Sequence, residues 1–235
     1  MSIQAPQDGP VPPDRQETDE PGREPARRPR PRALGCLFEI VETLVLTLVV
    51  FFVIQTFVAQ PYRVVGPSME HTFVGGQYVL VDKLSPRVTG YHRGDVIVFN
   101  PPPGYEQEGK EPFIKRILGL PGDTVEIRDG KVYVNGAALD EPYIYDGQQT
   151  LPEGLEPPWV VPADNYLVMG DHRGASEDSR VFGFVKSGWI IGRAWLRYWP
   201  LSALGIVPAP SYGPIPTPAA PAPTAAALPA ASATP

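Results

Sequence analysis

The sequence predicts a mainly β protein in which an antiparallel, barrel-like β domain follows one N-terminal transmembrane helix. Residues 43–59 form an uncharged apolar run near the N-terminus. Beyond this run, the chain consists of short β-branched and aromatic segments separated by turn-forming residues. No long segment there repeats apolar residues with the period of a helix, so strands joined by turns are expected.

The composition argues against several kinds of partner and cofactor. The 235 residues include 20 Lys+Arg and 26 Asp+Glu, a net charge of −6. Nucleic-acid-binding domains normally carry a basic face, so no nucleic-acid partner is expected. The only cysteine, Cys36, excludes an intrachain disulfide and a cysteine-based metal site. The acidic residues and the three histidines show no metal-ligand spacing, so neither a metal nor another cofactor is expected.

Both ends of the chain have the composition of disordered tails. Residues 1–34 are rich in Pro, Arg, Glu, Asp and Gln and almost lack aliphatic side chains. Such a segment cannot bury enough apolar surface to offset the entropy lost on folding. Residues 209–235 are rich in Pro and Ala, which also indicates a disordered tail. Residues 61–208 remain for the β domain, and they suffice for a core.

Residues 35–60 are expected to form the transmembrane helix. The apolar run, extended back to Leu37, reaches the roughly 20 residues that span a bilayer. Basic residues favour the cytoplasmic side, and four arginines precede the run: Arg27, Arg28, Arg30 and Arg32. The N-terminus is therefore predicted to be cytoplasmic, and everything after Gln60 is predicted to lie across the plasma membrane.

Other membrane signals fit the segment less well. A cleaved signal peptide also has a basic flank, but its apolar core is usually shorter. It would end in small residues at alternate positions, and Phe57 occupies such a position in Phe57-Val58-Ala59. A lipoprotein site at Cys36 is disfavoured because the apolar run follows this cysteine. Reversible acylation of Cys36 remains open.

The β domain is expected to contain many short strands. They lie near residues 77–81, 95–99, 124–128, 131–135, 160–161, 166–169, 181–185 and 190–198. Apolar and polar residues alternate on both sides of Asp129-Gly130, which is a strong hairpin signal. Residues 100–112 and 141–158 are expected to be loops.

Three segments carry residues suited to chemistry. Residues 66–72 place Ser68 between Pro67 and Met69. Residues 113–123 place Lys115 among apolar neighbours before a Gly/Pro turn, and lysines rarely occupy fully apolar surroundings. Residues 170–183 are dense in short polar and charged residues, which can arrange hydroxyls and a carboxylate–guanidinium pair around a site.

These segments, together with residues 94–99, closely resemble the conserved boxes of bacterial type I signal peptidases. The resemblance runs from the anchor to about Pro208 and includes Gly192-Arg193-Ala194 and Tyr198-Trp199-Pro200. Several motifs in the same order make it specific. It implies a membrane-bound serine endopeptidase with an all-β catalytic domain and no cofactor. It also implies preprotein substrates, whose signal peptides carry small residues at the first and third positions before the cut.

By this resemblance, Ser68 is the nucleophile and Lys115 is its general base. Ser176 matches the hydroxyl that orients the lysine amine. Some members carry a hydroxyl that assists the oxyanion hole two residues before the nucleophile, and Gly66 stands there in this chain. The resemblance therefore leaves the oxyanion hole chiefly to the backbone N–H of Ser68.

The remaining positions that match the family have supporting roles. Met69 matches the residue after the nucleophile, and Asp178 and Arg180 match a pair that supports the site. The chain departs from the family at His71, where Pro is often found, and at His172, where Asn is often found. Neither position carries the chemistry.

The proposed base must be neutral to act. The ordinary pKa of lysine is about 10.4, and lowering it by roughly 3 corresponds to about 4 kcal/mol of disfavoured charge. Burial beside Phe113, Ile114 and Ile117 would disfavour the charge in this way. Activity should then decrease as the pH falls through the lowered pKa.

Other functions remain open from the sequence. A Ser-His-Asp triad can be written with His71 or His172 and Asp171. An inactive, membrane-tethered β module that binds peptides would be favoured by the loss of Ser68 or Lys115, but both are present. A self-cleaving Ser/Lys repressor of the DNA-damage response is disfavoured by the spanning segment and by the lack of a DNA-binding region.

Five aromatic residues are candidates for an exposed apolar rim beside the bilayer, because Trp and Tyr favour membrane interfaces. They are Tyr62, Trp159, Trp189, Trp195 and Trp199. A place in the core is the alternative for each of them.

Overall fold

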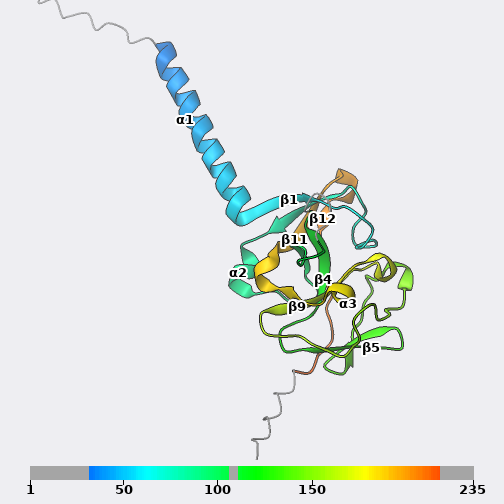
Figure 1. The fold of residues 1–235 in the computed structure, drawn as a ribbon. Coiled ribbons are helices and arrows are strands. Elements are labelled where there is room, and N and C mark those ends of the chain that lie inside the picture. The colour runs from blue at the N-terminus through cyan, green and yellow to red at the C-terminus, as the bar shows by residue number, and fades with distance from the viewer. Residues whose placement is uncertain (1–31, 106–110, 218–235) are drawn as a thin grey trace, which may run out of the picture. The chain divides into compact units, whose positions relative to one another are not determined.

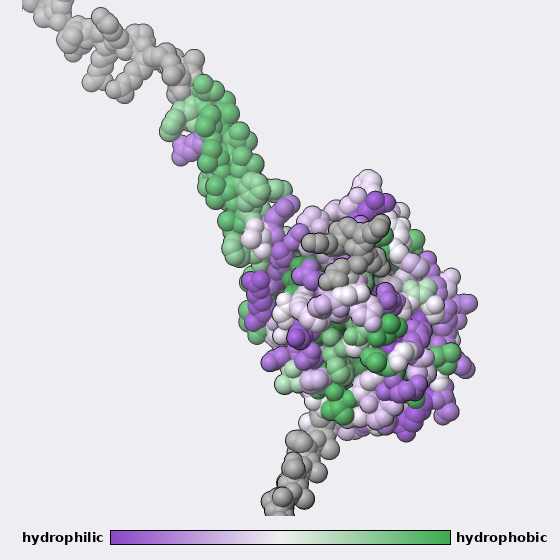
Figure 2. All heavy atoms as spheres, in the orientation of Figure 1, coloured by the Kyte–Doolittle hydropathy of each residue, from purple (hydrophilic) through white to green (hydrophobic). Residues whose placement is uncertain are grey.

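The computed structural model describes residues 32–105 and 111–217. Of the tails predicted to be disordered, residues 1–31 and 218–235 lie outside this part, whereas residues 32–34 belong to a helix. Helix α1 (Arg32–Val53) is followed by a π-helical turn, η1 (Ile54–Val58). Residues Cys36–Val58 have a mean hydropathy of 2.5, and none of this segment is buried. The helix is long and apolar enough to cross a membrane, and its surface is almost entirely hydrophobic (Figure 2).

The chain separates into two compact units, Met1–Thr47 and Leu48–Pro235. The second unit contains an eight-stranded sheet whose neighbouring strands are all antiparallel. In spatial order its strands are β1 (Ala59–Arg63), β2 (Tyr78–Asp82), β11 (Ile190–Trp199), β3 (Val96–Phe99), β4 (Phe113–Gly119), β9 (Asn165–Met169) and β10 (Val185–Lys186), with β12 (Gly205–Ile206) paired to β11. Strands β1 and β10 form the two ends of this order, so the sheet is open (Figure 1). The predicted mainly β, antiparallel fold is confirmed.

A second, four-stranded sheet packs at the other end of this unit from β1. Its order is β7 (Ala137–Ala138), β6 (Lys131–Val134), β5 (Thr124–Arg128) and β8 (Trp159–Val160). Strands β5 and β6 form the expected hairpin around Asp129 and Gly130, which have φ of 48° and 74°. Two consecutive positive φ angles are typical of a tight turn that matches the twist of the strands.

Strand β4 is buried along its whole length, and it contacts all three hydrophobic clusters of the domain. Ile114 packs with Val64, Met69 and the residues of β2, whereas Leu118 packs with the small sheet. Its remaining apolar residues join a cluster with β3 and β9. A strand buried on both faces holds its polar side chains away from water, which sets the surroundings of Lys115.

The strand predictions omitted β1, β4, β7 and β12, and they were wrong for residues 181–185. The sequence did not identify β4 as a strand, because Lys115 and Arg116 interrupt its apolar run. Residues 181–185 do not form one strand. Helix α3 (Ser179–Phe182) takes their first part, and Gly183, with φ of 82°, separates it from β10. Asp178 begins α3 because its side chain accepts the backbone N–H of Arg180, as an N-cap does.

Other short helical elements lie in the connections: α2 (Ser85–Thr89), η2 (Tyr145–Gly147), η3 (Arg173–Ala175), η4 (Ser187–Trp189) and η5 (Leu201–Ala203). The structure follows the C-terminal segment to Thr217. Tyr212 packs against the cluster of the small sheet, and its hydroxyl lies 2.7 Å from that of Tyr143. The packed part of the domain therefore extends beyond the boundary expected at Pro208.

Candidate active site

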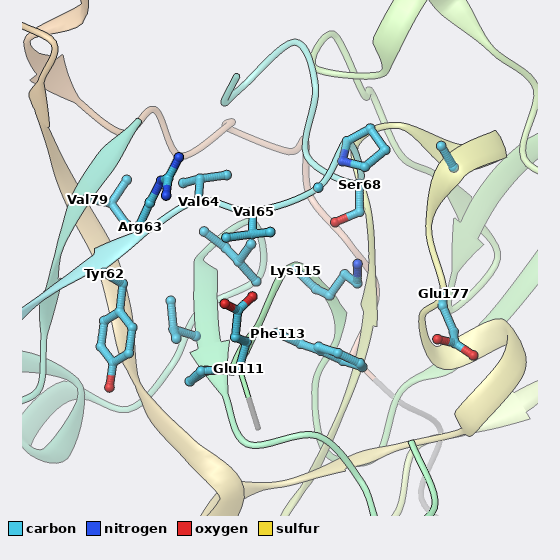
Figure 3. A pocket seen from close by; sticks show the side chains of 16 residues that line it. Tyr62, Arg63, Val64, Val65, Ser68, Val79, Glu111, Phe113, Lys115 and Glu177 are labelled. Carbon is cyan, nitrogen blue, oxygen red and sulfur yellow. The ribbon is translucent and has the colours of Figure 1, made fainter. Parts of the chain in front are cut away.

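A cleft of about 440 Å³ lies between the end of β1 with the segment that follows it and the beginning of strand β4. One wall is formed by residues from Tyr62 to Ser68 and the other by residues from Glu111 to Lys115, with Ala175 and Glu177 at one side. The Ser68 hydroxyl and the Lys115 amine face each other in this cleft (Figure 3). The structure therefore brings together the two residues that the sequence singled out as nucleophile and base.

Lys115 is held in apolar surroundings by strand pairing. It lies opposite Ile97 of β3, is 5% exposed, and has its Nζ 5.8 Å from the centre of the Phe113 ring. Burial lowers the pKa of Lys115 to about 8, although the negative charges of Asp178 and Glu177 act in the opposite direction. A substantial fraction of Lys115 is thus neutral near pH 8, as a general base requires.

Ser68 lies in a compact turn that follows Gly66, whose φ is 80°. Backbone hydrogen bonds close the turn, from Glu70 N–H to the Pro67 carbonyl (2.9 Å) and from Phe73 N–H to the Met69 carbonyl (2.7 Å). Met69 is buried in the cluster beneath β1 and β2, as is Phe73. Burial of Met69 fixes one end of the turn in the core while Ser68 remains at the cleft.

Ser176, Asp178 and Arg180 form one buried group beside the cleft. The hydroxyl of Ser176 donates to Asp178 Oδ2 (2.8 Å), and Arg180 donates from Nε and Nη2 to the two carboxylate oxygens (2.8 Å each). Burial would raise the pKa of Asp178, but the hydrogen bonds and charge of Arg180 outweigh it and lower that pKa. The ionised carboxylate therefore fixes the orientation of Ser176. Orientation of Lys115 by Ser176 stays a prediction.

Gly170 allows the segment of residues 170–183 to lie directly against the turn that carries Ser68. A Cβ at this position would lie 2.5 Å from both Ser176 Cβ and the Ser68 carbonyl oxygen, and nearer still to Ser176 Oγ. Gly170 N–H also donates to Asp178 Oδ2 (3.0 Å). Only a residue without a side chain allows Ser68 and Ser176 to approach this closely.

A second buried ion pair, between Arg116 and Asp171, contacts the Ser68 turn through Thr72. The sequence analysis did not identify this pair. Arg116 donates from Nε and Nη2 to the carboxylate of Asp171 (2.9 and 2.7 Å). Thr72 completes the group, since its hydroxyl donates to Asp171 (2.5 Å) and accepts from Arg116 (3.0 Å). Adjacent residues of β4 thus face opposite sides, with Lys115 at the cleft and Arg116 in this network.

The Ser-His-Asp alternative does not agree with the geometry. Asp171 is engaged by Arg116 and Thr72, so neither histidine is oriented by it. The Nδ1 atoms of His71 and His172 instead lie 3.1 Å from the Tyr143 carbonyl and 2.8 Å from Glu70 Oε2. In the described part of the chain, Lys115 is the base candidate that faces Ser68.

Comparisons with known proteins identify the family of this chain. The family model "Signal peptidase, peptidase S26" matches residues 37–199. The chain belongs to the signal peptidase family. Signal peptidase I of Leptolyngbya laminosa is 41% identical over 187 residues, which cover 78% of this chain and 90% of the relative. Signal peptidase IB of Staphylococcus aureus is 32% identical over 180 residues, covering 71% and 91%.

A crystal structure of a signal peptidase I from Enterococcus faecalis is 34% identical in sequence to the matched part. That match covers 44% of this chain and 95% of the other, with a TM-score of 0.36. Membership of the peptidase S26 family makes this chain a peptidase. The matched residues include both walls of the cleft.

Proposed function

We propose that this peptidase removes signal peptides from exported preproteins, with Ser68 as nucleophile and Lys115 as general base. The single observation that carries the proposal is the placement of a buried lysine, with its pKa lowered to about 8, facing the Ser68 hydroxyl in the cleft (Figure 3). Signal peptidases at 32–41% identity support the substrate class.

The chemistry follows from these two groups. The neutral amine of Lys115 accepts the proton of Ser68 as its Oγ attacks the scissile carbonyl carbon. The peptide C–N bond then breaks, and the leaving amine takes the proton from the Lys115 ammonium. Lys115 then deprotonates a water molecule, whose oxygen attacks the carbonyl carbon of the resulting ester. The bond from this carbon to Ser68 Oγ breaks, the Lys115 ammonium returns the proton to Oγ, and the signal peptide is released.

The oxyanion would be stabilised mainly by the backbone N–H of Ser68, because Gly66 offers no side chain. The substrate would lie as an extended strand along residues 62–66, where backbone groups can pair with it. The cleft there is lined by Val64, Val79 and Ile114, and their bulk leaves room for small side chains before the cut. Lys115 would remain shielded from water once the strand is bound.

The preprotein assay tests this function. The purified full chain is expected to cleave a preprotein with an Ala-x-Ala site, and mass spectrometry should place the cut directly after the second Ala. A chain that binds this preprotein without cutting it would indicate the peptide-binding module instead. Cleavage at unrelated sites would refute the assigned specificity.

The pH dependence of cleavage is a further prediction. Only neutral Lys115 acts as base, so kcat/KM should rise with pH and level off above about 8. In Glu177→Gln the loss of a nearby negative charge lowers the pKa of Lys115 further, which moves the acid limb to lower pH. Glu126→Gln, on β5 of the small sheet, is the control and should leave the limb in place. A profile that stays flat down to about pH 6 would contradict a lysine base.

We also propose that α1 anchors the protein in the plasma membrane with a cytoplasmic N-terminus and an extracytoplasmic catalytic domain. Of the five aromatic rim candidates, Trp195 and Trp199 are 44% and 52% exposed on β11, whereas Trp159 is buried and Tyr62 and Trp189 are partly buried. Exposed Leu201, Leu204 and Ile206 follow the two exposed tryptophans. This apolar surface suits contact with a lipid bilayer.

Protease accessibility tests this orientation. In right-side-out membrane vesicles, added protease is expected to digest the catalytic domain, and in inside-out vesicles the domain should be protected until detergent is added. An epitope at the N-terminus should show the reverse pattern. Protection of the domain in right-side-out vesicles would refute the orientation.

A further inference from the structure

The turn that carries Ser68 has an unusual backbone conformation at His71. The φ angle of His71 is 83°, in the left-handed region that residues other than glycine adopt infrequently. Proline cannot adopt it, because its ring holds φ near −65°. The chain from Ser68 to Thr72 therefore follows a path that a proline at position 71 would not allow.

The His71 side chain contacts the backbone of Tyr143, in a different segment of the chain. Its Nδ1 lies 3.1 Å from the backbone carbonyl oxygen of Tyr143. Tyr143 is itself buried, and its ring stacks on the Arg116 guanidinium at 4.0 Å. When Nδ1 carries the proton, it donates to the Tyr143 carbonyl and links His71 to the buried Arg116–Asp171 pair through Tyr143.

The adjacent Glu70 is held by a second histidine. Glu70 Oε2 lies 2.8 Å from Nδ1 of His172, and the His172 ring stacks on Tyr145 with a centroid separation of 4.2 Å. The backbone N–H of His172 donates to the carbonyl oxygen of Ser68 itself (3.1 Å). One residue thus contacts the nucleophile turn through both its backbone and its side chain.

We propose that Glu70, His71 and His172 form a clamp that holds the Ser68 turn in its reactive conformation. The three are positioning residues, and the inference rests on the proposed nucleophilic role of Ser68. Their side chains come from two segments that approach each other only in the fold.

Each contact of the clamp is weak alone. Side chains of Glu70 and His172 are 34% and 16% exposed, so solvent screens their interaction. Their effect on the reaction is larger than on stability, because a displacement of the nucleophile by about 1 Å can lower a rate 100-fold. The clamp should therefore appear in kcat, with little change in KM or in thermal stability.

Substitutions at His71 test the backbone part of the clamp. His71→Pro is expected to lower kcat for preprotein cleavage at least about 100-fold. His71→Asn tolerates a positive φ and places an amide near the position of Nδ1, so it should keep kcat within about threefold of wild type. Equal kcat in His71→Pro and wild type, or equal losses in His71→Pro and His71→Asn, would overturn the proposal.

A second comparison applies if His71→Pro does not fold. Both His71→Gly and His71→Ala lack the side-chain hydrogen bond, but only glycine adopts a positive φ without cost. The kcat of His71→Gly should therefore exceed that of His71→Ala severalfold. An alanine variant as active as the glycine variant would overturn the backbone part.

The side-chain part is tested at Glu70 and His172. Each of Glu70→Ala and His172→Ala is expected to lower kcat about fivefold, and the double variant should lose no more than either single one, because both remove the same contact. His172→Asn can still donate to Glu70 and should recover kcat to within about twofold. An unchanged kcat in His172→Ala, or no recovery in His172→Asn, would overturn this part.

The controls separate the clamp from the proposed function and from misfolding. His92→Ala removes an exposed histidine in the turn before β3, and it should match wild type. Ser68→Ala measures the residual rate in the same assay. If Ser68→Ala retains full activity, the proposed function fails. If it is inactive while the clamp variants match wild type, only the clamp fails. Unchanged melting temperatures in the variants would assign the loss to positioning.

Discussion

Lys115→Met is expected to abolish cleavage of an Ala-x-Ala preprotein, lowering kcat/KM at least about 10⁴-fold. Methionine fills a similar volume in the buried environment of β4 but cannot accept a proton, so the Ser68 hydroxyl remains a poor nucleophile. Ser68→Ala should show a loss of the same size, because the two groups act as one unit. The double variant should be no worse than either single one, and kcat/KM from preprotein cleavage measures all three.

The matched control for the first prediction is Lys131→Met. Lys131 is an exposed lysine at the start of β6, in the small sheet. Its replacement should leave kcat/KM within about twofold of wild type, as is usual for surface changes. Substantial cleavage by Lys115→Met would show that another group takes the proton of Ser68. Loss of activity in the His71→Asn and His172→Asn variants as well would then favour a histidine.

Gly170→Ala is expected to have the second largest effect, a loss of at least about 100-fold in kcat. The new methyl group would lie 2.5 Å from the Ser68 carbonyl oxygen and from Ser176 Cβ. Neither atom is the end of a flexible side chain, so the nucleophile turn and the Ser176 segment must move apart. Overpacking of this kind costs about 1–3 kcal/mol, and the displacement of Ser68 lowers the rate further.

Gly174→Ala is the control for this prediction, because it lies in the same segment. A Cβ at Gly174 would meet nothing nearer than Gln148 Oε1 at 3.6 Å, an ordinary contact. This variant should keep both kcat and thermal stability. Wild-type kinetics in Gly170→Ala would mean that the close approach of Ser68 and Ser176 is not needed for cleavage.

Much of the fold could be predicted from the sequence because the residue patterns that indicate it lie within short segments. The apolar run of the anchor, the alternation around Asp129-Gly130 and most strands could be recognised within windows of a few residues. Strand β4 was not recognised, because Lys115 and Arg116 break its apolar pattern. Only tertiary structure shows that one of these cations faces the cleft and the other pairs with Asp171.

The candidate site, like the fold, could be predicted from the sequence only in part. The sequence alone determined the family resemblance, and with it the choice of Ser68 and Lys115 as the residues to examine. The tertiary structure decided how those residues are held, since Thr72 meets Asp171 across 99 residues and Glu70 meets His172 across 102. Such contacts leave no periodic trace in a sequence. They arise when strands far apart in the chain pair and bring the connections next to them together. Burial in the same packed domain lowers the pKa of Lys115.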